Sequence, residues 1–135
     1  MLVNEAAEIS RDHMSCCLIG LDDPHYYGCD DLTAATRAVP AEMFKILLVH
    51  SPEMIADADK AGIRLYLCGH THAGQIRLPG IGPIITHANC RRKYTAGLWR
   101  HGSLIGYTSP GVGSSLLPVR YLCPPAVTVF TLHRG

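Results

Sequence analysis

The sequence lacks three features that would assign it to a common class of protein. None of its apolar runs approaches the ~20 residues that a membrane-spanning helix needs. Its six cysteines form no Cys-x-x-Cys pair, which argues against a structural zinc site. Its net charge is only +1, so no overall positive field would attract nucleic acid. We therefore expect no membrane span within these residues and no nucleic-acid partner.

The composition is that of an ordinary folded domain. The chain has 135 residues, of which 47% are hydrophobic and 17% are charged. This length is near the commonest domain size, and we find no repeat or linker, so residues 1–135 are expected to form one domain. Cys16 and Cys68 fall in apolar runs and are interpreted as small buried side chains. We expect a location in the cytoplasm or on the cytoplasmic face of a membrane.

Two histidines follow a short apolar run in the middle of the chain. Residues 65–76 read Leu-Tyr-Leu-Cys-Gly-His-Thr-His-Ala-Gly-Gln-Ile, which predicts a buried strand that ends near Gly69. Gly69 and Gly74 permit backbone conformations that a Cβ would obstruct. Imidazoles are common metal ligands, and two of them on one tight loop can reach adjacent points. The spacing alone leaves open a polar loop whose imidazoles bond to the backbone.

A second strand ending in histidine strengthens the metal interpretation. Residues 44–49, Phe-Lys-Ile-Leu-Leu-Val, predict a largely apolar strand, and His50 follows it directly. A helix is predicted after it, with Ser51 as N-cap, Pro52 in its first turn and Gly62 at its end. This strand–helix–strand pattern predicts parallel strands, whose carboxyl ends gather functional residues at one edge of the sheet.

Other elements are expected from local patterns. Asp30 or Asp31 can cap a helix that runs to about Val39, before Pro40. Further strands are predicted over residues 2–9, 14–21, 94–100, 103–108, 119–122 and 126–132, with the third and fourth of these forming a hairpin.

The two histidine-bearing segments resemble the calcineurin-like metallophosphoesterase superfamily. Residues 47–50, Leu-Leu-Val-His, and residues 69–76, Gly-His-Thr-His-Ala-Gly-Gln-Ile, match the last two of that family's five metal-site motifs. Softer matches to a bacterial, often membrane-associated branch lie at residues 20–24, 111–113, 117–120 and 124–129. The resemblance implies an α/β fold, namely the C-terminal half of a four-layer α-β-β-α sandwich with mixed sheets flanked by helices.

The resemblance also implies an activity and its cofactors. Members use two divalent ions, such as manganese, iron or zinc, and a water nucleophile to hydrolyse phosphoester or pyrophosphate bonds. His50 and His70 would bind one ion and His72 the other. The family's earlier Gly-Asp and Gly-Asn-His motifs are absent from this sequence, so no catalytic residue is identified. We expect the chain alone to be weakly active or inactive, and expect any membrane association to depend on an N-terminal part that the sequence does not contain.

Five further residues are candidates for substrate contact or for shaping the site loops. Asp23 and His25, in Asp-Pro-His, either act as ligands or cap a loop near the mouth of the site. Thr71 either touches substrate or, through its hydroxyl, shapes the loop of residues 69–75, which we call the histidine loop. Gln75 either faces the site or bonds to the backbone, and His87 is a candidate for substrate contact.

Two alternatives to a hydrolase are considered. The first is a non-catalytic scaffold or remnant of the phosphoesterase fold, in which half a sandwich exposes an apolar sheet face and favours self-association. The second is a structural-zinc protein that uses Cys90 and Cys123 with histidines, although their spacing fits no closed site. Separately, Ala73 replaces a glycine that is common in the family's Gly-His-Thr-His motif. This replacement would strain the loop if that position needs a positive φ.

Overall fold

The computed structural model describes residues 1–133 as an α/β fold built on a mixed sheet. Both α-helices are short, and no helix in the described part is long and apolar enough to cross a membrane. Two further elements, η1 and η2, are single 3₁₀ turns. In chain order the elements are β1 (Glu5–Arg11), β2 (Met14–Gly20), α1 (Leu32–Thr36), β3 (Phe44–Leu48), α2 (Ile55–Lys60), β4 (Leu65–Cys68), η1 (His72–Gly74), β5 (Arg77–Leu78), β6 (Gly82–Pro83), η2 (Arg92–Tyr94), β7 (Gly97–His101) and β8 (Leu104–Thr108).

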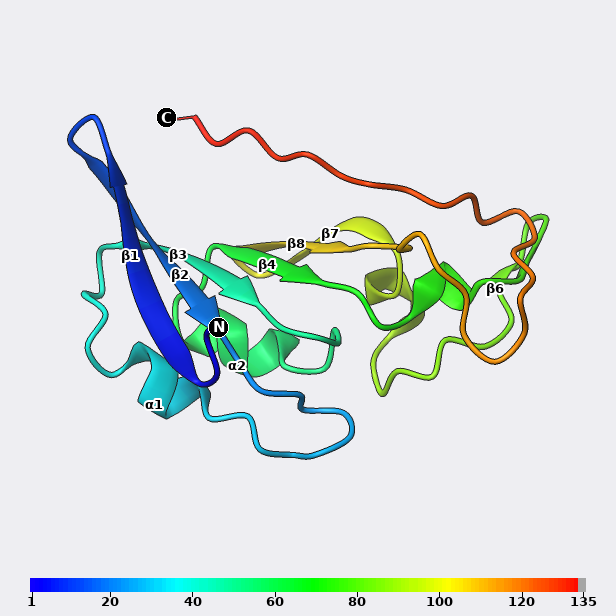
Figure 1. Cartoon of the computed structure of the whole chain (residues 1–135), viewed down its shortest axis with the longest axis horizontal. Coiled ribbons are helices and arrows are strands. Elements are labelled where there is room, and N and C mark those ends of the chain that lie inside the picture. Colours follow the sequence, from blue (N-terminus) through cyan, green and yellow to red (C-terminus); the bar gives the residue numbers. More distant parts are fainter. Residues whose placement is uncertain (134–135) are drawn as a thin grey trace.

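Six strands form the main sheet in the order β1-β2-β3-β4-β8-β7 (Figure 1). The four inner strands pair in parallel, while β1 and β7 are antiparallel edges. The predicted strand–helix–strand unit is confirmed, because β3 and β4 pair in parallel on either side of α2. The predicted hairpin is also confirmed as β7 and β8, although its first strand begins at Gly97. Parallel neighbours end at the same edge, so the loops after β3 and β4 lie side by side.

One face of this sheet carries the core under α1 and α2. Side chains alternate between the faces, so Leu47 is fully buried toward the helices whereas Leu48 on the opposite face is 37% exposed. Trp99 closes the far end of this core: its ring lies where a Cβ on Gly106 would clash, and its indole N–H donates to Thr108 Oγ1 at 2.9 Å. The core therefore runs continuously from α1 to β7.

The first helix begins where the sequence predicts and ends earlier. Asp31 is its N-cap, and its Oδ1 accepts from Ala34 N at 2.7 Å. The helix ends at Thr36 and not near Val39, and the Thr36 hydroxyl donates a hydrogen bond to Leu32 O at 2.7 Å.

The predicted start of the second helix at Ser51 is wrong, because α2 begins at Ile55. The buried Tyr66 hydroxyl donates to Ser51 O at 2.7 Å and accepts from Met54 N at 3.2 Å. Because a side chain takes these backbone bonds, residues 51–54 form a turn. Gly62 follows the helix with φ +74°, as its predicted terminating role requires.

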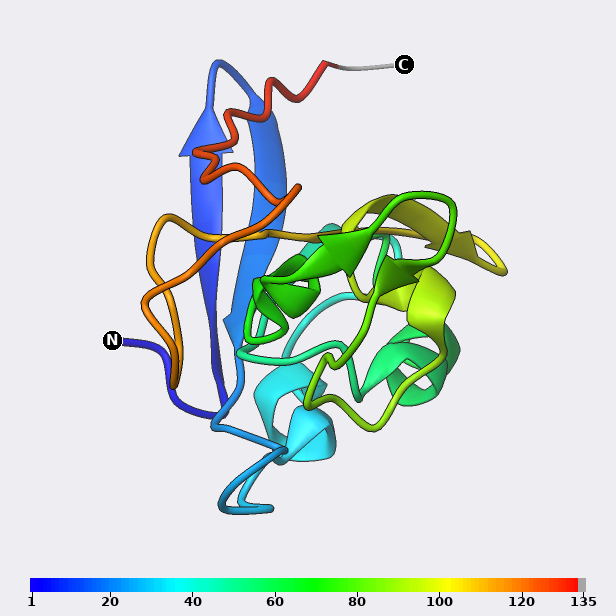
Figure 2. The same cartoon turned by 90° about the vertical axis from the view of Figure 1, so that its right-hand side faces the viewer.

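The strands predicted over residues 119–122 and 126–132 are wrong. Only Tyr121 takes part in β-structure, through an isolated bridge to Ile76, and residues 122–133 have no regular structure. Figures 1 and 2 show this C-terminal segment crossing the sheet on the side away from the helices. A strand needs a neighbouring backbone, and this segment does not run along an edge of the sheet.

The C-terminal segment meets the sheet through side chains instead. Thr128 Oγ1 lies 2.6 Å from the Tyr107 hydroxyl, and the Phe130 ring packs edge-on against Tyr107 at 5.2 Å between centroids. We call this side of the sheet the open face. It is apolar and only partly covered, since Phe44 is 42% and Leu98 is 68% exposed.

Candidate functional site

The loops after β3 and β4 carry the first two predicted ligands. His50 lies two residues past the end of β3 and His70 two residues past the end of β4. Val49 N donates to Leu67 O at 3.2 Å, and Gly69 N donates to His50 O at 3.0 Å. The parallel pairing thus continues beyond the strand ends and holds the two loops together.

The side chains of His50 and His70 meet directly. His50 Nε2 lies 2.9 Å from His70 Nδ1. The other ring nitrogen of His70, Nε2, lies 2.9 Å from the backbone carbonyl oxygen of His87. Because a carbonyl only accepts, His70 Nε2 carries a proton, and in the neutral ring Nδ1 keeps a lone pair directed toward His50.

The surroundings of His70 favour that neutral ring. Burial lowers its pKa below the ordinary value for histidine, and the nearby His25 and His50 lower it further. The hydrogen bond to His87 raises the pKa by less than burial lowers it. A neutral imidazole is the form that binds a metal ion.

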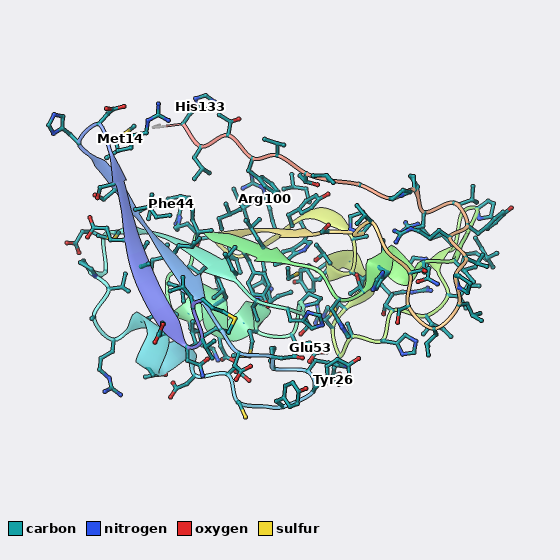
Figure 3. The ribbon with its side chains drawn as sticks, viewed as in Figure 1. Met14, Tyr26, Phe44, Glu53, Arg100 and His133 are labelled. Atoms are coloured by element: carbon teal, nitrogen blue, oxygen red, sulfur yellow. The ribbon has the colours of Figure 1, made fainter. Side chains whose placement is uncertain are left out.

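His25 is brought to this pair, and Glu53 holds it there. The His25 ring lies 4.3 Å from the His70 ring between centroids, and its Nδ1 is 2.8 Å from Glu53 Oε1. The same carboxylate oxygen accepts from Asn89 N at 2.7 Å. Glu53 and Tyr26, both labelled in Figure 3, each contact His25, and the Tyr26 ring meets the His25 ring edge-on at 4.7 Å between centroids. Glu53 thus links three loops beside the histidines.

Asp23 is used within its own loop. Its Oδ1 accepts from His25 N at 2.8 Å, and its own N–H donates to Asp22 Oδ1 at 2.8 Å. The structure therefore separates the two members of the Asp-Pro-His motif: the His25 ring reaches the histidine pair, and the Asp23 carboxylate caps the turn that leads to it.

His72 and Thr71 form the next part of the site. His72 Nδ1 is buried and has no hydrogen-bond partner among the described residues. The buried Thr71 hydroxyl donates to Thr95 O at 2.7 Å and accepts from Ala73 N at 3.2 Å. The Thr71 hydroxyl therefore both donates to and accepts from backbone groups of the loops around it.

The histidine loop has a strained backbone. His70, His72, Ala73 and Gln75 all have positive φ, between 49° and 66°. This conformation costs a residue with a Cβ about 1–2 kcal/mol. Ala73, with φ 52°, is one of these positions, so the condition under which the missing glycine would strain the loop is met.

Gln75 connects the histidine loop to a distant segment. Its Nε2 donates to Ser115 O at 3.1 Å and to Leu117 O at 2.7 Å. Its Oε1 accepts from Ser115 N at 2.7 Å. The side chain therefore makes three hydrogen bonds to the backbone of residues 115–117, which we call the clamp loop.

One cavity of about 640 Å³ unites these parts. Most of the predicted site residues line it, and Asp23 and His25 do not. Its lining combines two kinds of side chain, the imidazoles of four histidines and the aliphatic side chains of isoleucine and leucine residues. The lining residues are Tyr26, His50, His70, Thr71, His72, Gly74, Gln75, Ile76, Ile84, Ile85, Thr86, His87, Ser115, Leu116 and Leu117.

The histidine pair fits a divalent ion. His50 Nε2 and His70 Nδ1 face each other across a hydrogen bond of 2.9 Å, and an ion bound by both nitrogens would replace that hydrogen bond. The bond from His70 to the His87 carbonyl is the outer contact that ligating histidines usually make. However, no group of three or more His, Cys, Asp or Glu within residues 1–133 is placed to hold an ion. The fit thus extends to a pair of ligands and includes no bridging carboxylate.

Sequence reasoning missed Glu53 and the clamp loop. The sequence patterns predict no role for Glu53 at the site, although its place three residues after His50 indicates that it could reach the site. Residues 115–117 lie 40 or more positions from Gln75 in the sequence, and no local pattern predicts that they contact it.

Comparison with known proteins identifies several relatives. An uncharacterized metallophosphoesterase of Bacillus subtilis, YkuE, is 41% identical over 105 residues, which are 78% of this chain and 36% of the relative. The phosphodiesterase YaeI of Escherichia coli is 33% identical over 132 residues, which are 98% of this chain and 47% of the relative. A transmembrane protein with metallophosphoesterase domain from Danio rerio is 31% identical, and 99% of this chain covers 32% of it.

These relatives are considerably longer than the chain, which spans between about a third and a half of their length. No family model matches the chain, and no solved structure matches it significantly. The three relatives are nevertheless named as a metallophosphoesterase, a phosphodiesterase and a protein with a metallophosphoesterase domain, match most or nearly all of the chain, and come from bacteria and a vertebrate. The chain therefore belongs to the calcineurin-like metallophosphoesterase superfamily.

Proposed function

We propose that this chain supplies the histidine ligands of a metal-dependent phosphoester hydrolase. The observation that carries the proposal is the contact of His50 Nε2 with His70 Nδ1 at 2.9 Å, in a cavity that His72 also lines. The names of the relatives, metallophosphoesterase and phosphodiesterase, support a hydrolase at the level of the family.

Each residue of the site has a distinct role in this proposal. His50 and His70 would hold one divalent ion, and the buried Nδ1 of His72 offers a further ligand in the same cavity. The bound ion would act as a Lewis acid toward phosphoryl oxygens. The His87 carbonyl fixes the tautomer of His70, and Glu53 orients His25 against the His70 ring.

The finer parts of the proposal rest on the family resemblance. The complete site would hold two ions of manganese, iron or zinc and would use water as the nucleophile. Its carboxylate and amide ligands would come from motifs that this sequence does not contain, so the chain alone is predicted to hydrolyse phosphoesters weakly or not at all. The four-layer sandwich, the pyrophosphate alternative among substrates, and a location on the cytoplasmic side stay predictions.

The proposal is tested by metal binding and hydrolysis in parallel. The chain, purified without a chelating tag, is loaded with Mn²⁺, Fe²⁺ or Zn²⁺, and its metal content is measured by elemental analysis. Hydrolysis of bis(p-nitrophenyl) phosphate is then compared between this chain and a full-length relative. We expect His50→Ala and His70→Ala to lose metal in the chain, and the equivalent full-length variants to lose hydrolysis. If neither variant changes metal content, the assignment of ligands fails.

A scaffold is the second candidate, and two observations favour it. No three-residue metal cluster is present in the described part of the chain, and the open face is apolar and partly uncovered. A scaffold would bind no metal under any loading and would associate with itself or with a partner through the open face. Light scattering decides this point, since a monodisperse monomer that binds metal contradicts the scaffold.

A further inference from the structure

We propose that Cys123 is a positioning residue, whose thiol holds His72 in the conformation in which it binds a metal ion. The inference rests on the proposed function, because it takes His72 as a ligand. It goes beyond that function by giving a role to a residue that does not line the cavity and acts only through the backbone of His72.

Cys123 contacts the histidine loop through its thiol. Its Sγ lies 3.2 Å from the carbonyl oxygen of His72, which is 51 positions earlier in the sequence. Because a carbonyl only accepts, the thiol donates its proton in this bond. The same oxygen accepts from Gln75 N at 2.9 Å, so both of its lone pairs are used. The peptide group that follows His72 is therefore held both from within its own loop and from a distant segment.

His72 has two features that are unfavourable unless its surroundings hold it in place. Its φ is +49°, a conformation that residues with a Cβ rarely adopt. Its Nδ1 is buried and has no hydrogen-bond partner among residues 1–133, although it lies in a side chain that lines the cavity. Such an arrangement persists only where neighbouring contacts fix it, and a bound ion would supply the partner that Nδ1 lacks. The contact from Cys123 is one of those that fix it.

The thiol is itself held by a rigid side chain. Arg120 Nη2 donates to Cys123 Sγ at 3.3 Å, and Arg120 Nε donates to Cys123 O at 2.8 Å. The guanidinium also donates to Pro110 O at 2.8 Å and to Gly113 O. Because its donors form a planar fork, Arg120 fixes Cys123 relative to residues 110–113. The sulfur thus accepts from the guanidinium and donates to His72 O.

The backbone beside Cys123 is paired to the end of the histidine loop. Tyr121 N donates to Gln75 O at 2.9 Å, and Tyr121 O accepts from Arg77 N at 3.0 Å. Cys123 is only 4% exposed, yet it lies outside the main core and in a segment without regular structure. Its burial therefore comes from docking against the histidine loop, which is where a positioning residue for His72 has to lie.

The first test measures Mn²⁺ affinity, by titration with the electron paramagnetic resonance signal of the free ion. Mn²⁺ is chosen because thiolates are poor ligands for it, so loss of the cysteine does not remove a ligand. Cys123→Ala should weaken Mn²⁺ binding about tenfold, the usual cost of losing an outer contact to a metal ligand. Cys123→Ser keeps a donor for His72 O and should recover most of that loss.

Two comparisons separate positioning from general packing. Cys17→Ala removes an equally buried sulfur from β2, in the main core, and should leave Mn²⁺ affinity unchanged. In a His72→Ala background, Cys123→Ala should cause no further loss, because its effect passes through His72. The same loss in both backgrounds, or in Cys17→Ala, would show a structural role only and would overturn the inference.

A readout without metal follows the ring of His72 directly. Deuterium exchange of its C2 hydrogen, measured by mass spectrometry, should accelerate about twofold to tenfold in Cys123→Ala and stay unchanged in Cys17→Ala. Weaker Mn²⁺ binding without faster exchange overturns the inference. If Cys123→Ala binds Mn²⁺ normally while His50→Ala loses it, the inference fails and the proposed function stands. If the unmodified chain binds no Mn²⁺, the proposed function fails and the inference fails with it.

Discussion

Two parts of the cavity lining are built in different ways, the histidine end (His50, His70 and His72) and the apolar end (Ile84, Ile85, Leu116 and Leu117). The histidine end rests on β3 and β4, and its two rings meet because parallel strands hold their loops together. The residues of the apolar end lie in loops that belong to no strand or helix. Gln75 joins the clamp loop to the histidine loop, and residues 84–87 are joined to the same region by the bond from Ile84 N to Ile76 O at 3.3 Å and by the contact of His70 with His87 O.

This difference separates two tasks. A group that must meet an ion within a fraction of an ångström is best placed on a rigid element, whereas side chains that only line the rest of the cavity can lie on loops. We therefore expect changes in the core to disturb the histidine end strongly. Changes in the loops should alter the apolar end and leave the stability of the fold nearly unchanged.

The largest expected effect comes from the core beneath the histidine end. Leu47→Ala removes a fully buried side chain from β3 and should lower the free energy of unfolding by about 2–5 kcal/mol. Leu48→Ala, one residue further along the same strand but on the open face, should cost within about 1 kcal/mol. Urea unfolding measures both, and equal losses would contradict the assignment of the core to one face.

A smaller loss is expected within the histidine loop. Thr71→Val keeps the volume but leaves Thr95 O and Ala73 N without their buried partner, which should cost about 1–3 kcal/mol. Thr33→Val, on the exposed side of α1, is the control and should change stability by about 0.5 kcal/mol or less. A neutral Thr71→Val would show that its hydroxyl does not shape the loop.

The apolar end should respond in its dynamics. Gln75→Ala removes three hydrogen bonds to the clamp loop, so exchange of the Ser115 amide should accelerate about twofold to tenfold. The amide of Ile105, bonded to Arg64 O in the sheet region, serves as the internal reference and should not change. Equal acceleration at both amides would mean that Gln75 stabilises the whole fold.

The smallest expected change is a gain in stability. Ala73→Gly relieves a positive φ of 52°, and after the entropy lost by glycine the net gain should be about 0.5–1 kcal/mol. Ala58→Gly, in the buried middle of α2, should instead destabilise by about 1 kcal/mol or more. Thermal unfolding distinguishes the two, and a loss in both variants would contradict the strained conformation of Ala73.

The histidine end could be predicted from the sequence because its signals are local. An apolar run followed by histidine predicts a strand that ends in a ligand, and the intervening helical segment predicts the parallel pairing that β3 and β4 show. The cap at Asp31 and the turn at Gly62 are also local, and both are present.

The parts that could not be predicted depend on contacts between distant residues. Ser51 is a typical helix N-cap, but the hydroxyl of Tyr66, 15 residues away, bonds to Ser51 O and holds residues 51–54 in a turn. Glu53 meets His25 across 28 positions, and no spacing rule connects them. Residues 126–132 alternate like a strand, yet an extended segment becomes a strand only where a backbone is available to pair with it.

The central claim is that His50 and His70 hold a divalent ion together. The most direct measurement is the metal content per chain after loading with Mn²⁺ or Zn²⁺, for the unmodified chain, His50→Ala and His13→Asn. His50 is exposed, so its replacement should not disturb the fold, and His13→Asn removes an exposed imidazole in the β1–β2 turn where asparagine tolerates the positive φ. The account predicts about one ion in the unmodified chain and in His13→Asn, and none in His50→Ala. Equal metal content in all three, or none in any, would contradict it.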